Sequence, residues 1–388
     1  MRTRVVDTIA GVDRSAWNGL ALGGSPFLRH EFLEALETTR CADPGNGWQP
    51  MHVLIEDAAG QLAAAVPLYL KSHSWGEFVF DWSWANAYAR AGLDYYPKLV
   101  SAIPFTPAPG PRLLCSPSRD PNVLRGAAIA ALEGLVKSLG VSSLHVLFTA
   151  PDDHAAFIEA GFLPRKDCQF HWYNRGYGSF DEYVETFRAD KRKKLRRERR
   201  RIAEAGIRFE THDWRSLDAR AWKQVHALTA DTFRRRGHDH YLSTDFFIAV
   251  AREQPDAVMV KLAVRGGAPV AAAIFFVGAD TLYGRYWGTH QDFHSLHFEA
   301  CYYQGIDFCI ERGLARFEPG TQGEHKIARG FEPTATWSAH WIAEPRFTRA
   351  IRQYLHQEAL AVDAYMSDAR RHLPFHRDLP AGSAADGP

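Results

Sequence analysis

Residues 281–333 read TLYGRYWGTHQDFHSLHFEACYYQGIDFCIERGLARFEPGTQGEHKIARGFEP, and their pattern is the main basis for the fold that we expect. Alternating side-chain character over residues 282–287 predicts a β-strand. From residue 296 to residue 312, apolar side chains recur with the spacing of an α-helix, which Gly313 can end in a left-handed conformation. A short returning strand at 315–318 and a polar, glycine-containing loop at 320–329 follow. The stretch therefore predicts strand, helix, strand and loop, as in α/β proteins.

Side chains that can carry chemistry are concentrated in the same stretch. Glu299, Glu324 and His325 can act as bases, and Tyr286 can act as an acid. Glu299 lies at the start of the predicted helix, where the helix dipole alone also favours a carboxylate, so a structural role is equally open. The loop sequence GEHK (323–326) brings an acid, a base and a cation together where packing gives little reason for them. We take these four residues as the catalytic candidates.

Other side chains of this half are suited to hold a substrate. They are Arg285, His297, Gln322, Lys326 and Arg329. His290, His294, His297 and Glu299 raise the question of a metal site and make a metalloenzyme an alternative, because imidazoles three or four apart on a helix share one face. The first two precede the predicted helix, and the spacing matches no metal signature, so we expect no metal.

Several segments are similar, almost word for word, to one bacterial family. They are SPFLRHEFLEALE (25–37), PFTPAPGPRLL (104–114), LYGRYWG (282–288), LHFEACYYQGI (296–306) and FEPGTQGEHKIARGFEP (317–333). These words resemble the FemAB-like branch of the GNAT acyltransferase superfamily, a group labelled as peptidoglycan-biosynthesis-like, and the resemblance covers most of the chain. It implies an α/β fold with mixed sheets (α+β in character), in two GNAT-like domains packed as in FemAB-type proteins.

The expected domains follow from this resemblance and from a repeated pattern. QLAAAVPLYL (61–70) and PVAAAIFFV (269–277) are similar strands that indicate a duplicated unit. We expect an N-terminal GNAT-like domain at 1–168 and a C-terminal GNAT-like domain at 169–375. Residues 376–388, rich in Pro, Gly, Ala and Asp, are expected to form a flexible tail.

Composition restricts the classes of protein to consider. The 388 residues are 46% hydrophobic and 23% charged, which is ordinary for a globular protein, and the net charge of +1 gives no global attraction to nucleic acid or anionic membrane. Five cysteines without a CxxC pair favour reduced thiols. Because no run approaches the roughly 18 apolar residues of a membrane helix, we expect no membrane insertion and a cytoplasmic location.

One local patch is strongly basic. Residues 191–201, KRKKLRRERRR, hold nine cations among eleven residues, with Leu195 and Ile202 as sparse apolar anchors nearby. A solvated helix face is one interpretation, and phosphate binding, which would relieve the self-repulsion, is the other. Arg192 and Arg196 match a basic helix of FemAB-like proteins, and that resemblance implies a phosphorylated donor or acceptor. They are candidate binding residues, with tRNA as one partner.

The N-terminal half offers a second group of binding candidates: Lys71, His73, Lys98 and Arg112. The first two belong to LKSHSWGEFVFDWSWANAY (70–88), where aromatic and polar residues alternate as in a half-buried strand. The resemblance puts Lys98 and Arg112 near the domain interface, where pockets are favoured, so an acceptor pocket is expected there. The reacting centre is expected between the PFTP loop (104–107) and the GEHK loop (323–326).

The function that this pattern and the resemblance imply is acyl or aminoacyl transfer to a small-molecule amine. Acyl-CoA-dependent GNAT enzymes cradle the pyrophosphate with a glycine-rich loop, but here the corresponding segment, THQDFHSL (289–296), has no glycine. Aminoacyl-tRNA or another phosphorylated donor is therefore favoured, and no cofactor is certain. An acyl-CoA-dependent N-acyltransferase and a non-catalytic module that binds a phosphorylated metabolite or RNA are the alternatives.

Overall fold

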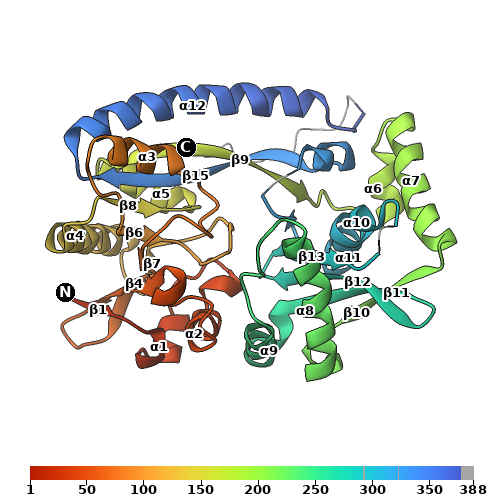
Figure 1. Cartoon of the computed structure of the whole chain (residues 1–388), viewed down its shortest axis with the longest axis horizontal. Coiled ribbons are helices and arrows are strands. Elements are labelled where there is room, and N and C mark those ends of the chain that lie inside the picture. Colours follow the sequence, from red (N-terminus) through yellow and green to blue (C-terminus); the bar gives the residue numbers. More distant parts are fainter. Residues whose placement is uncertain (292, 322, 377–388) are drawn as a thin grey trace. The chain divides into compact units, whose positions relative to one another are not determined.

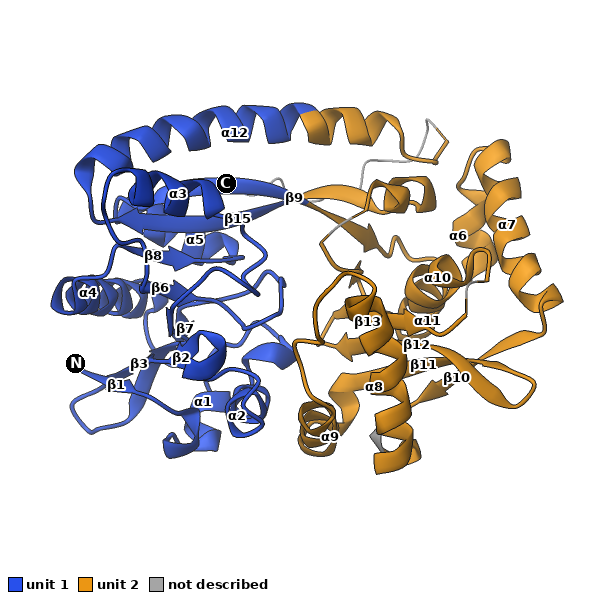
Figure 2. Cartoon of the chain, in the orientation of Figure 1, with its two compact units in different colours: residues 1–168, 335–364, 387–388 blue, residues 169–334, 365–386 orange. Residues whose placement is uncertain are grey.

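The computed structural model describes residues 1–291, 293–321 and 323–376. The chain forms two compact units (Figure 2). Among the described residues, unit 1 consists of Met1–Cys168 and Ala335–Ala364, and unit 2 of Gln169–Thr334 and residues 365–376. Unit 1 thus includes a segment that the sequence prediction assigned to the second domain. The tail expected at 376–388 lies, beyond His376, outside the described residues.

Unit 1 combines short strands with helices (Figure 1). Its strands are β1 (Arg2–Val6), β2 (Trp48–Pro50), β3 (His52–Glu56), β4 (Leu62–Val66), β5 (Tyr69–Lys71), β6 (Lys98–Ser101), β7 (Leu114–Cys115) and β8 (Ser143–Val146). Its helices are α1 (Arg14–Asn18), α2 (His30–Thr38), α3 (Trp82–Arg90), α4 (Pro121–Leu139) and α5 (Pro151–Glu159). Three elements contribute residues to both units: β9 (Leu163–Tyr173), β15 (Glu332–Ile342) and α12 (Pro345–Arg371).

The sheets of unit 1 are mixed. Strands β1, β3, β4 and β7 pair antiparallel in that order. In the second sheet β15, β8, β6, β5 and β2 follow one another, and the β6–β8 pair is parallel. Leu124, Ala128 and Leu132 of α4 are buried in one apolar core with β3 and β4, because their spacing puts them on one face of the helix.

Unit 2 contains the stretch on which the prediction was based (Figure 1). Its further strands are β10 (Ile207–His212), β11 (Val258–Arg265), β12 (Ala268–Val277), β13 (Thr281–Thr289) and β14 (Arg316–Glu318). Its helices are α6 (Phe180–Glu185), α7 (Ala189–Glu204), α8 (Ala219–Arg234), α9 (Thr244–Glu253), α10 (Leu296–Phe298) and α11 (Gln304–Arg312). A π-helical segment, Glu299–Tyr303, joins α10 to α11, and a 3-10 turn occupies Glu324–Arg329.

The sheet of unit 2 runs β10, β11, β12, β13, β14, β9 and is antiparallel except between β13 and β14. That parallel pair is only three residues long, from Thr281 opposite Arg316 to Tyr283 opposite Glu318. Helix α8 packs directly on β13 at Gly288, where an added Cβ would lie 1.8 Å from the backbone oxygen of Leu228. A glycine is therefore required for this close approach.

The expected α/β fold with mixed sheets is confirmed. The predicted strand at 282–287 is the middle of β13, and the basic run is helical within α7. The strand expected within 70–88 is wrong after residue 71, because a loop leads into α3, which begins at Trp82. Polar side chains of that loop turn inward to a buried lysine, as described below, so the alternation does not arise from a sheet. Among the described residues, no helix is both long and apolar enough to span a membrane.

Candidate functional site

The π-helical segment organises the candidate site of unit 2. The segment follows the short helix α10, and the residue before α10, Ser295, adopts a left-handed conformation with φ of 73°. Such segments are frequent at functional sites because they reorient side chains within a helix. Here His297, Phe298 and Tyr302 contact the loop that carries His325. Glu299 and Tyr303, which directly follow Phe298 and Tyr302 in the chain, contact α7 instead.

His325 and Tyr302 form a hydrogen-bonded pair at the surface. The Tyr302 hydroxyl lies 2.7 Å from Nε2 of His325, and the imidazole is exposed while the phenol is buried. Gly323 permits this placement, since its φ is +117° and a Cβ there would lie 2.3 Å from Cε1 of His325. Partial burial and the cations of Lys326 and Arg329 lower the pKa of His325. The imidazole is therefore neutral at pH 7, as a general base must be.

The surroundings of this pair are aromatic and cationic. The His297 ring lies 5.7 Å from the His325 ring and 5.5 Å from the Trp287 ring. Burial, together with His325 and the cations Arg329, Lys326 and Arg236, lowers the pKa of His297 to about 4. A neutral imidazole pair is thus surrounded by positive charge, which favours an anionic ligand.

Arg329 connects the loop to the basic helix. Its Nη1 donates to the backbone oxygen of His325 at 2.7 Å, and its Nη2 donates to both carboxylate oxygens of Glu198 at 3.0 Å. The guanidinium also covers the Phe298 ring at 3.3 Å. Glu198, on α7, accepts a further hydrogen bond of 2.5 Å from the Tyr303 hydroxyl. All these charged groups are buried, so each depends on its partner.

Glu299 is held by the same helix. Its Oε1 accepts hydrogen bonds from Arg199 at 3.0 Å and from the Gln304 amide at 2.8 Å. Burial raises the pKa of Glu299, although Arg199 opposes the shift. Arg199 also donates to Asp307 at 2.7 Å, so it bridges two carboxylates. The contacts tie Glu299 to α7, and within the described residues its Oε2 has no hydrogen-bond partner.

A second group of charges lies where β13 and β14 stop pairing. The register of β13 against β12 skips Arg285, so that residue forms a bulge, a feature frequent next to active sites. Glu318, the last residue of β14, is buried and lies 3.2 Å from Arg316. Burial raises the pKa of its carboxyl group against the influence of Arg316 and Arg285. Lys326, also buried, donates to the backbone oxygen of Gly320 at 2.6 Å.

The basic helix has two different faces. Leu195, Glu198 and Ile202 are buried, whereas most of its cations are exposed. A groove of about 350 Å³ runs along it and is lined by Ala189, Arg192, Lys193, Arg196, Arg197 and Arg200. Arg192 and Arg196 are paired with Glu185 of α6 at 3.2 and 2.5 Å. The lining contains no carboxylate.

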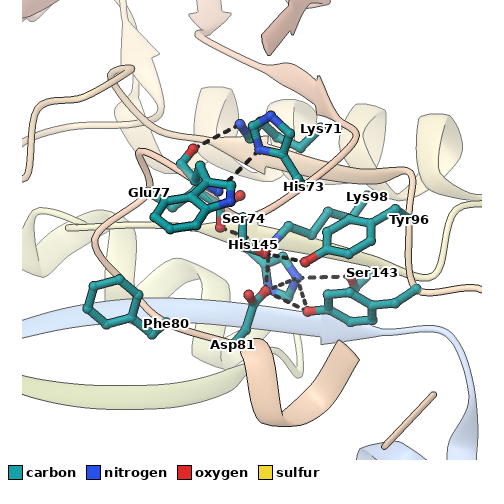
Figure 3. A network of polar contacts seen from close by, with 12 residues as sticks. Lys71, His73, Ser74, Glu77, Phe80, Asp81, Tyr96, Lys98, Ser143 and His145 are labelled. Atoms are coloured by element: carbon teal, nitrogen blue, oxygen red, sulfur yellow. Dashed lines mark hydrogen bonds and ion pairs between the residues drawn. The ribbon is translucent and has the colours of Figure 1, made fainter. Parts of the chain in front are cut away.

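Unit 1 holds a buried polar network centred on Lys98 (Figure 3). The Lys98 ammonium donates to Ser74 and Glu77 at 2.8 Å and to the carboxylate of Asp81. Asp81 also accepts a hydrogen bond of 2.6 Å from the Tyr95 hydroxyl. Burial raises the pKa of Glu77 to about 7. Burial also disfavours ionised Asp81, but the Lys98 charge outweighs it and lowers the pKa of that carboxyl.

The network continues through two histidines. The Tyr95 hydroxyl lies 3.1 Å from Nε2 of His145, whose Nδ1 lies 2.7 Å from Nδ1 of His340 on β15. Burial, reinforced by Lys98, lowers the pKa of His145 to about 3. Both imidazoles are fully enclosed, so the arrangement suits a structural network that fixes the 72–81 loop.

Comparison with known proteins assigns the family. The profile of a family described as peptidoglycan biosynthesis or recognition, FemAB-like, matches residues 8–377. The chain belongs to the FemAB-like family. No curated protein sequence was found to match it.

Solved structures resemble this FemAB-like protein in fold. One is the C-terminal domain of a putative lysylphosphatidylglycerol synthetase from Agrobacterium fabrum, with a TM-score of 0.54, 11% identity, and coverage of 92% of this chain and 98% of that one. FemX gives a TM-score of 0.53 at 11% identity, covering 91% and 100%. L-PGS from Bacillus licheniformis gives 0.52 at 10% identity, covering 84% and 96%. At these identities the likeness concerns the fold alone.

Several predicted site residues of the FemAB-like protein lie together. His297, Glu299, His325, Lys326 and Arg329 all belong to the π-helical segment, its flanks or the facing loop. Arg285 lies at the β13 bulge beside Glu318. Gln322 falls outside the described residues. In unit 1, Lys71 and Lys98 are fully buried and His73 is half-buried.

Three other predicted site residues make contacts outside the Tyr302–His325 pair. Glu324 is exposed, and its only described hydrogen bond comes from the Tyr365 hydroxyl at 3.2 Å, which is a surface contact. Tyr286 is buried among aromatic rings of α8, α9 and the loop between them, with His240 at 4.7 Å and Phe247 at 5.4 Å, because the bulge reverses its side. Arg112 donates to the backbone oxygens of Ala108, Gly110, Pro111 and Leu147, which gives it a structural role in its loop.

Sequence reasoning missed Tyr302, Glu198 and Arg199 as site residues. The regular helix expected over 296–312 places Tyr302 in its apolar stripe, and nothing in the local pattern signals a π-helical turn. Glu198 was available as a signal, since it is the single acid among residues 191–201. Among the described residues, no three His, Cys, Asp or Glu side chains gather in a way that would hold a metal ion.

Proposed function

We propose that this FemAB-like protein transfers an acyl or aminoacyl group to a primary amine, with His325 as the general base. The observation that carries the proposal is the Tyr302–His325 hydrogen bond of 2.7 Å, in which a neutral, exposed imidazole is paired with a buried phenol. Such transfer requires removal of a proton from the amine, stabilisation of an oxyanion and protonation of the leaving group. The pair supplies one group for each proton transfer.

The roles follow from the tautomer that suits the pair. With Nε2–H of His325 donating to the Tyr302 oxygen, Nδ1 keeps its lone pair and can take the proton of the attacking amine. Burial raises the pKa of Tyr302, so the phenol stays protonated at neutral pH. Its proton can then be donated to the oxyanion or the leaving group. Glu299, tied to Arg199, assists by holding the π-helical segment rather than by direct proton transfer.

A phosphorylated donor fits the charge of the site. Together with burial, the positive charges of Lys326 and Arg329 lower the pKa of His325, and Arg236 further lowers the pKa of His297. An anionic group beside the two imidazoles would be attracted by these charges. The cationic groove of α7 belongs to the same unit and suits the phosphate chain of aminoacyl-tRNA, the donor that we favour. The name lysylphosphatidylglycerol synthetase, carried by one similar structure, describes a product with an aminoacyl group. A tRNA donor also implies a cytoplasmic protein.

Two alternatives are tested by the same assay. One is acyl-CoA as donor, which the glycine-free segment between β13 and α10 disfavours. The other is a module that binds a phosphorylated ligand without turnover, favoured by the number of exposed cations on α7.

The assay supplies mixed aminoacyl-tRNA or acyl-CoA to the full chain with a panel of primary amines and follows transfer of the labelled acyl group. We expect His325→Asn to abolish most transfer while donor binding persists, and Glu324→Gln to retain it. Full turnover by His325→Asn would exclude the proposed base. Binding without turnover by the unmodified protein, across the whole panel, would favour the binding module.

A further inference from the structure

Glu198 occupies an unusual position in the basic helix. It is the only carboxylate among residues 191–201, and it faces inward with 5% of its surface exposed. It accepts both hydrogen bonds of a bidentate contact from Arg329, at 3.0 Å each, and one of 2.5 Å from Tyr303. A buried carboxylate is costly unless its hydrogen-bonding capacity is used, and here Nη2 of Arg329 and the Tyr303 hydroxyl donate three hydrogen bonds to it.

Arg329 extends this anchorage to the loop of His325. The same guanidinium that contacts Glu198 through Nη2 donates through Nη1 to the backbone oxygen of His325. Its face lies against Phe298, which is on the same helical segment as Tyr302. Arg329 therefore holds both partners of the Tyr302–His325 pair, one through the backbone and the other through the neighbouring ring.

We infer that Glu198 is a positioning residue that keeps His325 in hydrogen-bonding register with Tyr302, acting through Arg329. The inference rests on the proposed function for its catalytic meaning, although its geometry stands independently. Without the carboxylate, Arg329 loses its bidentate anchor and its buried charge has no counter-ion. The guanidinium then has reason to move towards solvent, and the backbone oxygen of His325 loses its donor.

A double-mutant cycle on the pKa of His325 tests this inference, because purely electrostatic effects add whereas a positioning effect does not. The pKa is measured by imidazole NMR in the full chain, with and without Tyr302→Phe, in unmodified, Glu198→Gln and Glu204→Gln backgrounds. Glu204 is the matched control, since it is an exposed carboxylate on the same helix, paired with Arg200 at 3.6 Å. No substrate is needed.

We expect Tyr302→Phe to lower the pKa of His325 by roughly half a unit in the unmodified and Glu204→Gln backgrounds, as the loss of one hydrogen bond would. In Glu198→Gln the same change should have little effect, because the pair is already separated. An equal effect of Tyr302→Phe in all three backgrounds would overturn the inference.

Arg329→Lys is the second variant, used if Glu198→Gln does not fold. It keeps the positive charge but cannot donate to Glu198 and to the His325 backbone in the same forked geometry. We expect it, too, to remove the effect of Tyr302→Phe, and persistence of the full effect would again contradict the inference. Failure of the proposed function is read separately, as unchanged transfer by His325→Asn, so the two outcomes remain distinguishable.

Discussion

The Tyr302 hydroxyl and Nε2 of His325 lie 2.7 Å apart, although 23 positions separate the residues in the chain. The contact exists because a π-helical turn directs Tyr302 towards a glycine-flanked loop. A phenol that bonds a neutral imidazole at the surface provides an acid and a base within reach of one substrate.

Tyr302→Phe should lower the transfer rate by about 10²-fold while leaving the affinity for the donor nearly unchanged, because the hydroxyl contributes to proton transfer more than to binding. Steady-state kinetics with the preferred donor and amine measure this. Tyr365→Phe, which removes a surface contact to Glu324, is the control and should be neutral. A raised KM with an unchanged kcat would assign Tyr302 to binding.

Lys193→Ala combined with Arg197→Ala should weaken binding of aminoacyl-tRNA and reduce the salt slope of the binding constant by roughly one to two. These side chains are exposed and line the α7 groove. Arg192→Ala with Arg196→Ala should also weaken binding, but less, because both already pair with Glu185. Filter binding at several salt concentrations measures the affinity of each double variant for aminoacyl-tRNA. Equal affinity of both double variants and the unmodified protein would reduce the groove to a solvated surface.

Lys98→Met should destabilise unit 1 by about 3–5 kcal/mol, because it leaves Glu77 and Asp81 buried without their counter-ion. Urea unfolding measures the loss. Lys137→Met, at an exposed position of α4, should change stability by less than about 0.5 kcal/mol. If the two variants behaved alike, the network in Figure 3 would not contribute to stability.

Stability should fall as the pH drops below about 6.5, the ordinary pKa of histidine. Burial lowers the pKa of His145 and His240 to about 3 and that of His297 to about 4. As the pH falls, these histidines become protonated in the unfolded chain at a higher pH than in the folded chain. Their contribution to the free energy of unfolding is therefore fully present above pH 6.5 and declines towards pH 4. Unfolding midpoints at pH 7, 6 and 5 measure this. His297→Gln should flatten the decline, whereas His356→Gln, exposed on α12, should not.

Acetyl-CoA should bind weakly or not at all. The segment between β13 and α10 contains no glycine, and Ser295 rather than a glycine takes the left-handed conformation before the helix. A segment without glycine does not allow the close backbone approach that a pyrophosphate needs. Calorimetry on the full chain tests this, and stoichiometric binding would favour acyl-CoA over aminoacyl-tRNA as the donor.

Local sequence patterns are enough to predict the fold class, the strand at 282–287, the basic helix and the loop that carries His325. These follow from the period of apolar side chains, from charge density and from glycine placement, all of which are local properties. His325, Lys326 and Arg329 were predicted as site residues because local packing gives little reason for polar groups in a short loop.

Which of these groups contact one another depends on the tertiary structure. The π-helical turn moved Tyr302 out of the expected stripe, and the bulge at Arg285 turned Tyr286 into an aromatic core. Arg112, a predicted binding residue, donates its hydrogen bonds to backbone oxygens. Glu198 points inward and binds Arg329, although residues 191–201 of its helix are otherwise almost entirely cationic. Each outcome depends on contacts between residues distant in the chain, whose desolvation and hydrogen bonding no local pattern records.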